Sequence, residues 1–558
     1  MLLQVENLKT YLQAGGETVK AVDGISFTIE RGETFCLVGE SGSGKSVTAL
    51  SVIQLLPRDI SHHPEGRILL DWRQDKQRHE PVDLLRLPET RKQKIRGARI
   101  AMIFQEPMTS LNPVFTVGEQ IIETLQLHFP GMEETEARER AVAALAQVQI
   151  SNPELRIDEY PHRLSGGQRQ RVMIAMAMAC EPDLLIADEP TTALDVTVQA
   201  EILRLMRELQ TRRNMGILFI THDFGVVSQM ARRLAVMRLG KIVESGTLDE
   251  ILYRPQHPYT CQLLAALPEN LKRRQRTSAR ESGIDAPPSY TGTKQPSLLE
   301  LRNLEVHFPV RKGVLRRVVD HVRAVDGINM AIPAGQILAL VGESGCGKTT
   351  LGRAILRLVE PTSGQVHYAG TDLTALKPRE LRRYRQTLQI IFQDPMSSLN
   401  PRLSIAATLT EPMGVHGIGD SREERLEQAS AVLERVQLKT HHLWRYPHEF
   451  SGGQRQRIAI ARALVLEPRF IVCDEITSAL DVSVQAEILQ LLLELQRERH
   501  LTLLFITHNI AVVEYLSNQI AVMRDGCIIE QGPTDQVCRA PTHPYTQKLL
   551  AAVPRVPL

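Results

Sequence analysis

Short runs of apolar residues divide the chain, and most of them end directly before a glycine-rich, acidic or histidine-containing motif. They occupy residues 35–38, 184–187 and 217–220 in the first half and 337–341, 470–473 and 503–506 in the second. Such bounded runs are typical of strands buried in a parallel sheet. Stretches with helical spacing lie between them, such as AEILRLMRELQ at 200–210. The pattern predicts α/β domains with polar motifs at the carboxyl ends of parallel strands.

The apolar runs and their motifs occur twice, with few changes between the two copies. The clearest pairs are GESGSGKS at 39–46 and GESGCGKT at 342–349, FQEPMTSLNP at 104–113 and FQDPMSSLNP at 392–401, SGGQRQR at 165–171 and 451–457, and HPYT at 257–260 and 543–546. An internal repeat of this length indicates two copies of one large domain. A chain of 558 residues is also too long for one hydrophobic core.

We expect the first domain to span residues 1–267 and the second to span 298–558. Residues 268–297 are polar, basic and rich in Pro, Ser and Gly, which predicts a flexible linker. The first copy is longer than the second between its GK motif and its FQ motif. The surplus falls in the charged run 71–84, where an extended surface hairpin is the simplest interpretation and a binding loop that includes His79 is the alternative.

Composition and charge narrow the class of protein. Apolar residues make up 43% of the chain and the formal net charge is only +2, so no concentrated basic surface for nucleic acid is expected. No stretch reaches the roughly 18 apolar residues of a spanning helix, and the N-terminus lacks the features of a signal peptide, so we expect a cytosolic chain. The seven cysteines are scattered without CxxC spacing, which predicts reduced thiols instead of disulfides or zinc.

The glycine-rich motif of each copy has the GxxxxGK[ST] pattern of a phosphate-binding loop. In such a loop, backbone N–H groups converge on the β-phosphate, the lysine reaches the β and γ oxygens, and the hydroxyl holds Mg²⁺. Because the pattern occurs twice after a predicted buried strand, chance is a poor explanation. The residues of the two loops are Gly39, Ser41, Gly42, Gly44, Lys45 and Ser46, and Gly342, Ser344, Gly345, Gly347, Lys348 and Thr349.

Two adjacent acids end the next apolar run of each copy, Asp188 with Glu189 and Asp474 with Glu475. A solvated surface pair is the simple alternative, but the position after a buried strand favours function. The aspartate of each pair is expected to hold the Mg²⁺ shell. The glutamate is expected to accept a proton from the attacking water, or to orient that water, during γ-phosphate hydrolysis.

A histidine follows a further apolar run in each copy, His222 and His508. A single histidine after a strand is usually structural, but the repeated setting favours a contact with the γ-phosphate. Each copy also has an SGGQ motif that predicts a helix N-terminus open to an anion, although one phosphate loop is already present. The two motifs comprise Ser165, Gly166, Gly167 and Gln168, and Ser451, Gly452, Gly453 and Gln454.

Together these motifs resemble the ATP-binding cassette family over essentially the whole chain, twice. The resemblance implies two P-loop NTPase domains in tandem, each with a mainly parallel sheet and a helical subdomain, that bind ATP and Mg²⁺ and hydrolyse the nucleotide. It also implies a head-to-tail arrangement in which each SGGQ motif covers the ATP held by the other domain. The implied composite sites are Lys45, Glu189 and His222 with Ser451 and Gly453, and Lys348, Glu475 and His508 with Ser165 and Gly167.

The resemblance assigns further residues to each site. Gln105 and Gln393 match a loop that senses nucleotide, contributes to the Mg²⁺ site and faces the membrane subunits. Asp195 and Asp481 match a loop at the dimer interface, and Tyr11 and Phe308 match an aromatic residue that stacks on adenine, although an aromatic residue in a strand is more often part of the core.

The two copies differ at a few motif positions. Phe450 stands where the first copy has Leu164, and Ile476 stands where it has Pro190. Neither change removes a catalytic group, so we expect two competent ATPase sites, although Ile476 could alter the turn after Glu475. Cys346 lies in the second phosphate loop, beside a helix N-terminus and a lysine that stabilise a thiolate. Its alkylation is therefore expected to slow ATP hydrolysis, and ATP to protect it.

EPMTSLNP, DEPTTALDV and the HPYT runs resemble the peptide and nickel importer subfamily more narrowly. This resemblance implies an import motor on the cytoplasmic face of the bacterial inner membrane. Its partners would be two transmembrane permease subunits and, through them, an extracytoplasmic substrate-binding protein, with no other membrane contact. Glutathione or another small peptide is the implied cargo, with nickel chelates and opines as alternatives. A soluble tandem cassette protein that acts on ribosomes is the rival from another class.

Overall fold

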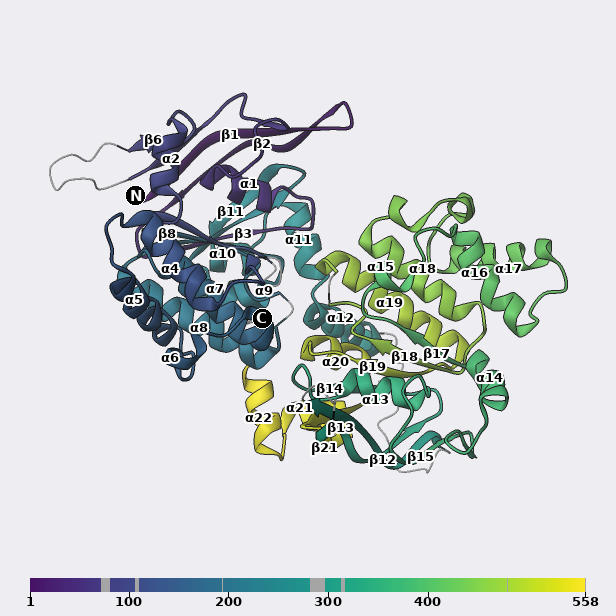
Figure 1. Cartoon of the computed structure of the whole chain (residues 1–558). Coiled ribbons are helices and arrows are strands. Elements are labelled where there is room, and N and C mark those ends of the chain that lie inside the picture. The colour runs from purple at the N-terminus through teal and green to yellow at the C-terminus, as the bar shows by residue number, and fades with distance from the viewer. Residues whose placement is uncertain are drawn as a thin grey trace. The chain divides into compact units, whose positions relative to one another are not determined.

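The computed structural model describes residues 1–71, 81–105, 110–192, 194–281, 297–312, 317–478 and 480–556. Its contacts divide the chain into two compact units. Unit 1 comprises Met1–Leu264 with Pro554–Leu558, and unit 2 comprises Ala265–Val553. Figure 1 shows that each unit combines a strand-rich part with a group of helices. The predicted α/β class with two domains in tandem is confirmed.

Unit 1 has a six-stranded main sheet that is parallel except at one edge. The strands in spatial order are β11 (Lys241–Thr247), β10 (Arg233–Arg238), β3 (Thr34–Val38), β9 (Gly216–Thr221), β8 (Leu184–Asp188) and β7 (Ile100–Ile103). Every residue of β3, β8 and β9 is buried, as the short apolar runs predict. Helices of this layer are α1 (Lys45–Ile53), α2 (Glu89–Ile95), α8 (Val196–Arg213), α9 (Phe224–Met230), α10 (Leu248–Tyr253) and α11 (Pro258–Ala265).

An antiparallel sheet and a helical group complete unit 1. The sheet consists of β2 (Glu17–Ile29), β1 (Leu3–Ala14), β5 (Arg67–Leu70) and β6 (Val82–Asp83), with β4 (Ser61–His62) beside β1. The helical group consists of α4 (Val117–His128), α5 (Glu134–Gln147), α6 (Pro153–Arg156), η1 (Pro161–Arg163) and α7 (Gly166–Met178). Strands β5 and β6 pair at the base of the predicted hairpin in 71–84. Residues 72–80, including His79, lie outside the described residues.

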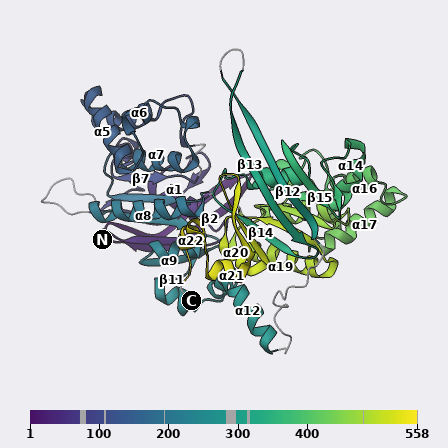
Figure 2. The same cartoon turned by 90° about the horizontal axis from the view of Figure 1, so that it is seen from below.

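Unit 2 repeats this plan. Its main sheet has the order β17 (Leu388–Ile391), β18 (Phe470–Asp474), β19 (Thr502–Ile506), β14 (Ile337–Val341), β20 (Gln519–Arg524) and β21 (Cys527–Pro533). Its antiparallel sheet consists of β13 (Arg317–Pro333), β12 (Ser297–Lys312), β15 (Ser363–Tyr368) and β16 (Thr371–Asp372). The two long strands β12 and β13 run side by side in Figure 2.

Helices of unit 2 correspond closely to those of unit 1. Around the main sheet lie α13 (Lys348–Ile355), α14 (Pro378–Thr387), α19 (Val482–Arg499), α20 (Ile510–Leu516), α21 (Thr534–Arg539) and α22 (Pro544–Ala551). The helical group consists of α15 (Pro395–Ser398), α16 (Ile405–His416), α17 (Arg422–Arg435), η2 (Thr440–Trp444), η3 (Pro447–Glu449) and α18 (Gly452–Leu464). Within the described ranges, neither unit has a helix long and apolar enough to cross a membrane.

The first part of the predicted flexible linker is a helix, α12 (Pro268–Glu281), which corrects that expectation. The side chain of Leu271 is 6% exposed and belongs to the hydrophobic core of unit 2. Lys272 forms ion pairs with Asp535 at 3.1 Å and Glu514 at 3.8 Å. A helix whose composition is otherwise that of a linker thus packs against unit 2 through a buried leucine and a paired lysine. Residues 282–296 lie outside the described residues.

Candidate functional site

The polar motifs of each unit lie at the carboxyl ends of the parallel strands. In unit 1, the phosphate loop follows β3 and leads into α1, while Asp188 ends β8 and His222 follows β9. These three strands are neighbours in the sheet. Residues from separate parts of the chain therefore converge at one edge, where open α/β sheets bind ligands.

The phosphate loop of unit 1 requires glycine at its turn into α1. Gly44 has φ +102°, and a Cβ there would collide with the Ala21 carbonyl. The ammonium group of Lys45 is buried and donates hydrogen bonds to the carbonyl oxygens of Gly39 and Glu40, both at 2.7 Å. By contrast, Ser41, Gly42 and Ser46 are exposed. The loop thus presents an open rim, and its lysine is held by its own backbone.

The loop of unit 2 has the same geometry. Gly347 has φ +107°, and Lys348 donates to the carbonyl oxygens of Gly342 and Glu343 at 2.8 Å. Ser344 and Gly345 are exposed. Cys346 is 9% exposed, with its sulfur 3.9 Å from the Lys348 nitrogen, where unit 1 has Ser43.

A hydroxyl and a carboxylate meet beside each loop. Ser46 donates to Asp188 at 3.2 Å in unit 1, and Thr349 donates to Asp474 at 2.9 Å in unit 2. Burial raises the pKa of Asp188 to about 6, since it disfavours the ionised form. A divalent cation would favour that form. The hydroxyl–carboxylate pair fits Mg²⁺, which takes few protein ligands and completes its shell with water and phosphate oxygens.

Glu189 is surrounded by three side chains that hydrogen-bond to its carboxylate. His222 Nδ1 lies 3.1 Å from one oxygen, while Gln105 and Thr192 each donate to the other oxygen at 3.0 Å. Burial opposes ionisation of Glu189, but the hydrogen bond and charge of His222 lower its pKa overall. The backbone has φ +47°, a strained conformation that directs the carboxylate into the cluster. An ionised carboxylate that lies beside the open rim of a phosphate loop is suited to accept a proton from water.

The corresponding cluster in unit 2 is more open. Gln393 donates to Glu475 at 2.8 Å, but His508 Nδ1 lies 3.8 Å from the carboxylate, beyond hydrogen-bond distance. Ser478 donates to the Glu475 carbonyl oxygen and not to its carboxylate. The turn itself is unchanged, since Glu475 has φ +48°. Ile476 therefore does not alter the turn that follows Glu475.

Each SGGQ motif begins a helix with a complete capping box. The Gln168 N–H donates to the Ser165 hydroxyl at 3.3 Å, and the Gln168 side chain accepts from the Ser165 N–H at 3.0 Å. In unit 2, Ser451 and Gln454 form the same pair at the start of α18. All four of these residues are at least partly exposed. A Cβ on Gly167 would collide with the Val198 side chain, which accounts for that glycine.

The predicted adenine-stacking residues lie on the long antiparallel strands and outside the core. Phe308 on β12 is 42% exposed. Tyr11 on β1 is half-buried, with its hydroxyl donating to Asp23 at 2.9 Å and the Lys20 nitrogen 5.6 Å from its ring centroid. Leu8 pairs with Ile25 and Leu304 with Ile328, so Tyr11 corresponds to His307 of the second repeat and not to Phe308. Both aromatic rings are accessible, which is compatible with stacking on a base. Asp195 and Asp481 precede α8 and α19 as N-cap residues.

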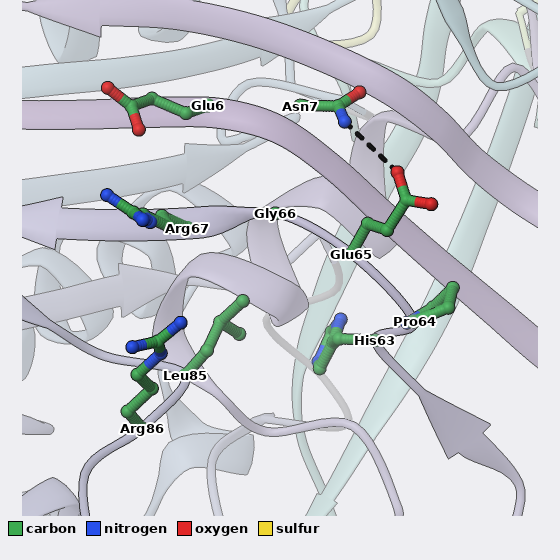
Figure 3. Close-up of a pocket in the computed structure, with 9 residues that line it drawn as sticks. All are labelled: Glu6, Asn7, His63, Pro64, Glu65, Gly66, Arg67, Leu85 and Arg86. Carbon is green, nitrogen blue, oxygen red and sulfur yellow. Dashed lines mark hydrogen bonds between the residues drawn. The ribbon is translucent and has the colours of Figure 1, made fainter.

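A cavity of about 710 Å³ lies elsewhere in unit 1, on the antiparallel sheet (Figure 3). Its lining includes Glu6, Asn7 and Glu65 and the two arginines Arg67 and Arg86. Asn7 donates to Glu65 at 3.2 Å, the bond drawn in Figure 3. None of the residues that line this cavity is a predicted site residue, so it is separate from the phosphate loop.

The sequence analysis missed two sets of contacts at the site. Thr192 donates to the Glu189 carboxylate, although the hydroxyls of DEPTTALDV and DEITSALDV had no assigned role. Tyr259 and Tyr545 of the HPYT runs contact the phosphate loops. The repeat of both motifs was the available signal, but a repeat does not identify the contact partner.

Comparison with known proteins identifies the family of the chain. Residues 22–192 and 325–478 match the ABC transporter family, and residues 243–291 and 529–557 match the family described as oligopeptide/dipeptide transporter, C-terminal region. The peptidoglycan transport ATP-binding protein YejF of Agrobacterium fabrum is 48% identical over 99% of this chain and 96% of its own length.

The glutathione import ATP-binding protein GsiA of Escherichia coli K12 is 48% identical, and that of Salmonella typhimurium LT2 is 47% identical. Each comparison covers 99% of this chain and 89% of the relative. With two P-loop domains, two acid–histidine clusters and full-length relatives, this chain belongs to the ATP-binding cassette transporter family as an ATP-hydrolysing subunit.

Proposed function

We propose that this chain is the ATPase motor of an importer for small peptides, with glutathione as the first candidate cargo. The match of both domain ends to the oligopeptide/dipeptide transporter C-terminal region carries the proposal. The names of the glutathione import relatives supply the candidate cargo. Peptides released from peptidoglycan are the second candidate, because a relative of similar identity is named for peptidoglycan transport.

The proposed partners are two transmembrane permease subunits that receive cargo from an extracytoplasmic binding protein. The chain would join the cytoplasmic face of the membrane through the permeases alone. Gln105 and Gln393 support this assignment, because each links an exposed loop to the catalytic carboxylate. Movement of the loop against a permease would then alter the position of Glu189 or Glu475.

The proposed reaction uses residues of the chain in distinct roles. Lys45 would exchange its bonds to backbone carbonyl oxygens for bonds to the β and γ phosphates. Glu189 would accept a proton from the attacking water, and His222 would hold that carboxylate in place. Ser46 and Asp188 would hold Mg²⁺, which supplies charge stabilisation at the phosphates when bound.

The proposed complete sites are composite. The exposed N-terminus of α18 at Ser451 would cover the nucleotide on Lys45, and that of α7 at Ser165 would cover the nucleotide on Lys348. Both helices begin with partly exposed N–H groups and the positive end of a helix dipole, which suit the γ-phosphate. ATP would then hold the domains together, and hydrolysis would release them.

An uptake assay tests the proposal. Cells that lack their own copy are given the parent chain or the double variant Glu189→Gln, Glu475→Gln, and uptake of radiolabelled glutathione, a dipeptide and a peptidoglycan-derived peptide is compared. We expect the variant to lose glutathione uptake, since loss of a general base slows hydrolysis by roughly 10²- to 10⁴-fold. Loss of uptake of the peptidoglycan-derived peptide alone would identify the second candidate as the cargo. Unchanged uptake of all three would refute a peptide importer.

A further inference from the structure

The HPYT runs form the same structure at the start of a helix in both units. In unit 1, Glu244 on β11 accepts hydrogen bonds from the N–H groups of Gln256 at 2.7 Å and His257 at 3.2 Å. The His257 ring nitrogen Nδ1 in turn accepts from the N–H of Tyr259 at 3.2 Å, and Pro258 begins α11. The carboxylate and the imidazole thus fix the backbone immediately before the tyrosine.

Unit 2 builds the turn with the equivalent residues. Glu530 on β21 accepts from the N–H groups of Thr542 at 2.7 Å and His543 at 3.1 Å. His543 Nδ1 accepts from the N–H of Tyr545 at 3.1 Å, and Pro544 begins α22. Because the glutamate, the histidine and the proline recur with the same contacts, the direction of the tyrosine is specified in both units.

Each tyrosine reaches the phosphate loop of its own unit. Tyr259 is 3% exposed, and its hydroxyl donates to the Glu40 carboxylate at 3.0 Å. Tyr545 is 7% exposed, and its hydroxyl oxygen accepts from the Glu343 N–H at 3.3 Å. An arginine lies over each ring, Arg238 at 4.5 Å and Arg524 at 4.9 Å. The rings are therefore held by cation–π contacts while their hydroxyls contact the loop.

The loop glutamate contacted by each tyrosine also contacts the phosphate-binding lysine. Lys45 donates to the Glu40 carbonyl oxygen at 2.7 Å, and Lys348 donates to the Glu343 carbonyl oxygen at 2.8 Å. Two hydrogen bonds through one residue thus connect the HPYT tyrosine to the lysine. The loop backbone that accepts hydrogen bonds from the lysine is thus anchored by a tyrosine from the C-terminal part of the domain.

We propose that Tyr259 and Tyr545 are positioning residues for ATP binding, which hold the first turn of each phosphate loop in the shape that receives the phosphates. They do not touch the nucleotide phosphates themselves. The inference rests on the family's ATPase activity and not on the identity of the cargo. It gives the C-terminal HPYT segment a role at the nucleotide site.

Nucleotide affinity is the direct test. Each tyrosine is tested in a purified full chain in which only the phosphate loop of its own unit can bind ATP. Tyr259→Phe is therefore combined with Lys348→Ala, and Tyr545→Phe with Lys45→Ala. Binding of a fluorescent ATP analogue and the melting temperature are measured. Loss of one hydrogen bond that supports the loop predicts a roughly five- to tenfold weaker affinity. Tyr253→Phe and Tyr384→Phe, which lie away from the loops, should bind as the parent does.

The two contacts differ, and a double-mutant cycle uses that difference. Tyr259 donates to the Glu40 carboxylate and also contacts the Glu40 backbone, so Tyr259→Phe should have a smaller effect in a Glu40→Ala chain than in the parent. Tyr545 bonds to a backbone N–H, so Tyr545→Phe should keep its effect in a Glu343→Ala chain. If the asymmetry appears in nucleotide affinity while the melting temperature stays unchanged, the tyrosines position the loop and do not merely stabilise the domain.

Two results would overturn the proposal. One is unchanged affinity in both phenylalanine variants, and the other is an affinity loss that accompanies a fall in melting temperature with no difference between the two cycles. Because the assay needs no cargo or permease, its outcome is independent of the transport assay. Failure of this inference would leave the import function untouched, and the reverse also holds.

Discussion

Adjacent carboxylates at the end of β8 respond in opposite directions to their surroundings. Burial raises the pKa of Asp188 to about 6. Burial also opposes ionisation of Glu189, but the hydrogen bond and charge of His222, the hydrogen bond from Thr192 and the charge of Lys45 together lower its pKa. The ionised form of Asp188 is therefore stabilised by a bound cation, whereas Glu189 stays ionised without one. Two neighbouring acids can thus serve metal binding and proton transfer separately. Unit 2 shows the same directions at Asp474 and Glu475.

Cys346 distinguishes the two phosphate loops at the residue scale. Its sulfur lies 3.9 Å from the Lys348 nitrogen, and the side chain is 9% exposed. We predict that a small alkylating reagent reacts slowly and reduces ATP hydrolysis at least twofold, because the adduct would crowd the loop. ATP should protect, and Cys346→Ser, which copies Ser43, should remain active and insensitive. Full activity after labelling of Cys346 verified by mass spectrometry would contradict this prediction.

Ile476 provides a second prediction at the residue scale. The candidate catalytic glutamates have nearly the same φ, +47° and +48°, and the same backbone hydrogen bond closes the turn after each of them, whether Pro190 or Ile476 follows. Ile476 is 2% exposed. We therefore expect Ile476→Pro to keep ATP hydrolysis within about twofold. Its free energy of unfolding should fall by roughly 1–2 kcal/mol from lost apolar burial. Denaturant titration and steady-state hydrolysis check both values, with Pro190→Ile as the matched change. A tenfold loss of hydrolysis with normal stability would show that the two turns are not equivalent.

At the element scale, hydrogen bonds at helix starts organise the site. Complete capping boxes begin α7 and α18. At the start of α22, the His543 side chain accepts a hydrogen bond from the N–H of Tyr545. These local features are visible in the sequence as SGGQ and HPYT. The helix α12 is different, because Leu271 and Lys272 hold it through contacts with distant parts of unit 2. Its existence could not be predicted from the polar composition of the segment.

Glu530 carries an element-scale prediction about pH. Burial opposes its ionisation, but hydrogen bonds from Thr542 and His543 lower its pKa to about 2. A pKa below the unfolded value stabilises the fold at higher pH, and the contribution is lost as pH falls from about 4.5 towards 2. We predict that Glu530→Ala lowers the free energy of unfolding by roughly 2–3 kcal/mol at pH 7.

The difference between Glu530→Ala and the parent chain should shrink as the pH is lowered to 4, because the parent carboxylate then approaches protonation in the unfolded chain. Denaturant titrations at pH 7, 5 and 4 measure it. Glu427→Ala, on the exposed face of α17, is the control and should have little effect at any pH. A penalty that stays constant with pH would mean that packing, and not the charge of Glu530, supports the turn.

At the scale of the whole molecule, the chain contains two similar domains whose acid–histidine clusters are unequal. His222 is within hydrogen-bond distance of Glu189, whereas His508 is 3.8 Å from Glu475. Identical motifs need not have identical geometry, because a shift of less than 1 Å in the distance between histidine and glutamate decides whether they form a hydrogen bond. If the proposed composite sites form, each of these clusters would work with the SGGQ helix of the other unit.

Paired substitutions test that head-to-tail arrangement. Lys45→Ala disables the first loop, so the remaining ATP would lie between Lys348 and Ser165. We predict that adding Ser165→Arg removes the residual ATP trapping, by tenfold or more, whereas adding Ser451→Arg leaves it unchanged. Trapping of radiolabelled nucleotide on the full chain measures this. The opposite pattern would mean that each SGGQ motif serves its own unit.

The sequence alone determined the class of fold, the two-domain plan and the positions of the motif residues. It could do so because buried parallel strands require uninterrupted apolar runs, and phosphate loops and helix caps are local structures that need particular residues at fixed spacing. The duplicated order of the strands and helices followed from the repeat. These features depend on neighbours in the chain, so the pattern of residues contains them.

Tertiary structure decided which distant groups meet. Tyr259 and Glu40 are 219 positions apart, and Tyr545 and Glu343 are 202 apart, so spacing could not link them. Packing between elements also decides three further features. These are the formation of helix α12, the accessibility of Phe308 and the different distances of His222 and His508 from their glutamates. A hydrogen bond exists only when two groups come within about 3 Å in the right direction, and that condition is set by the fold and not by the residue types.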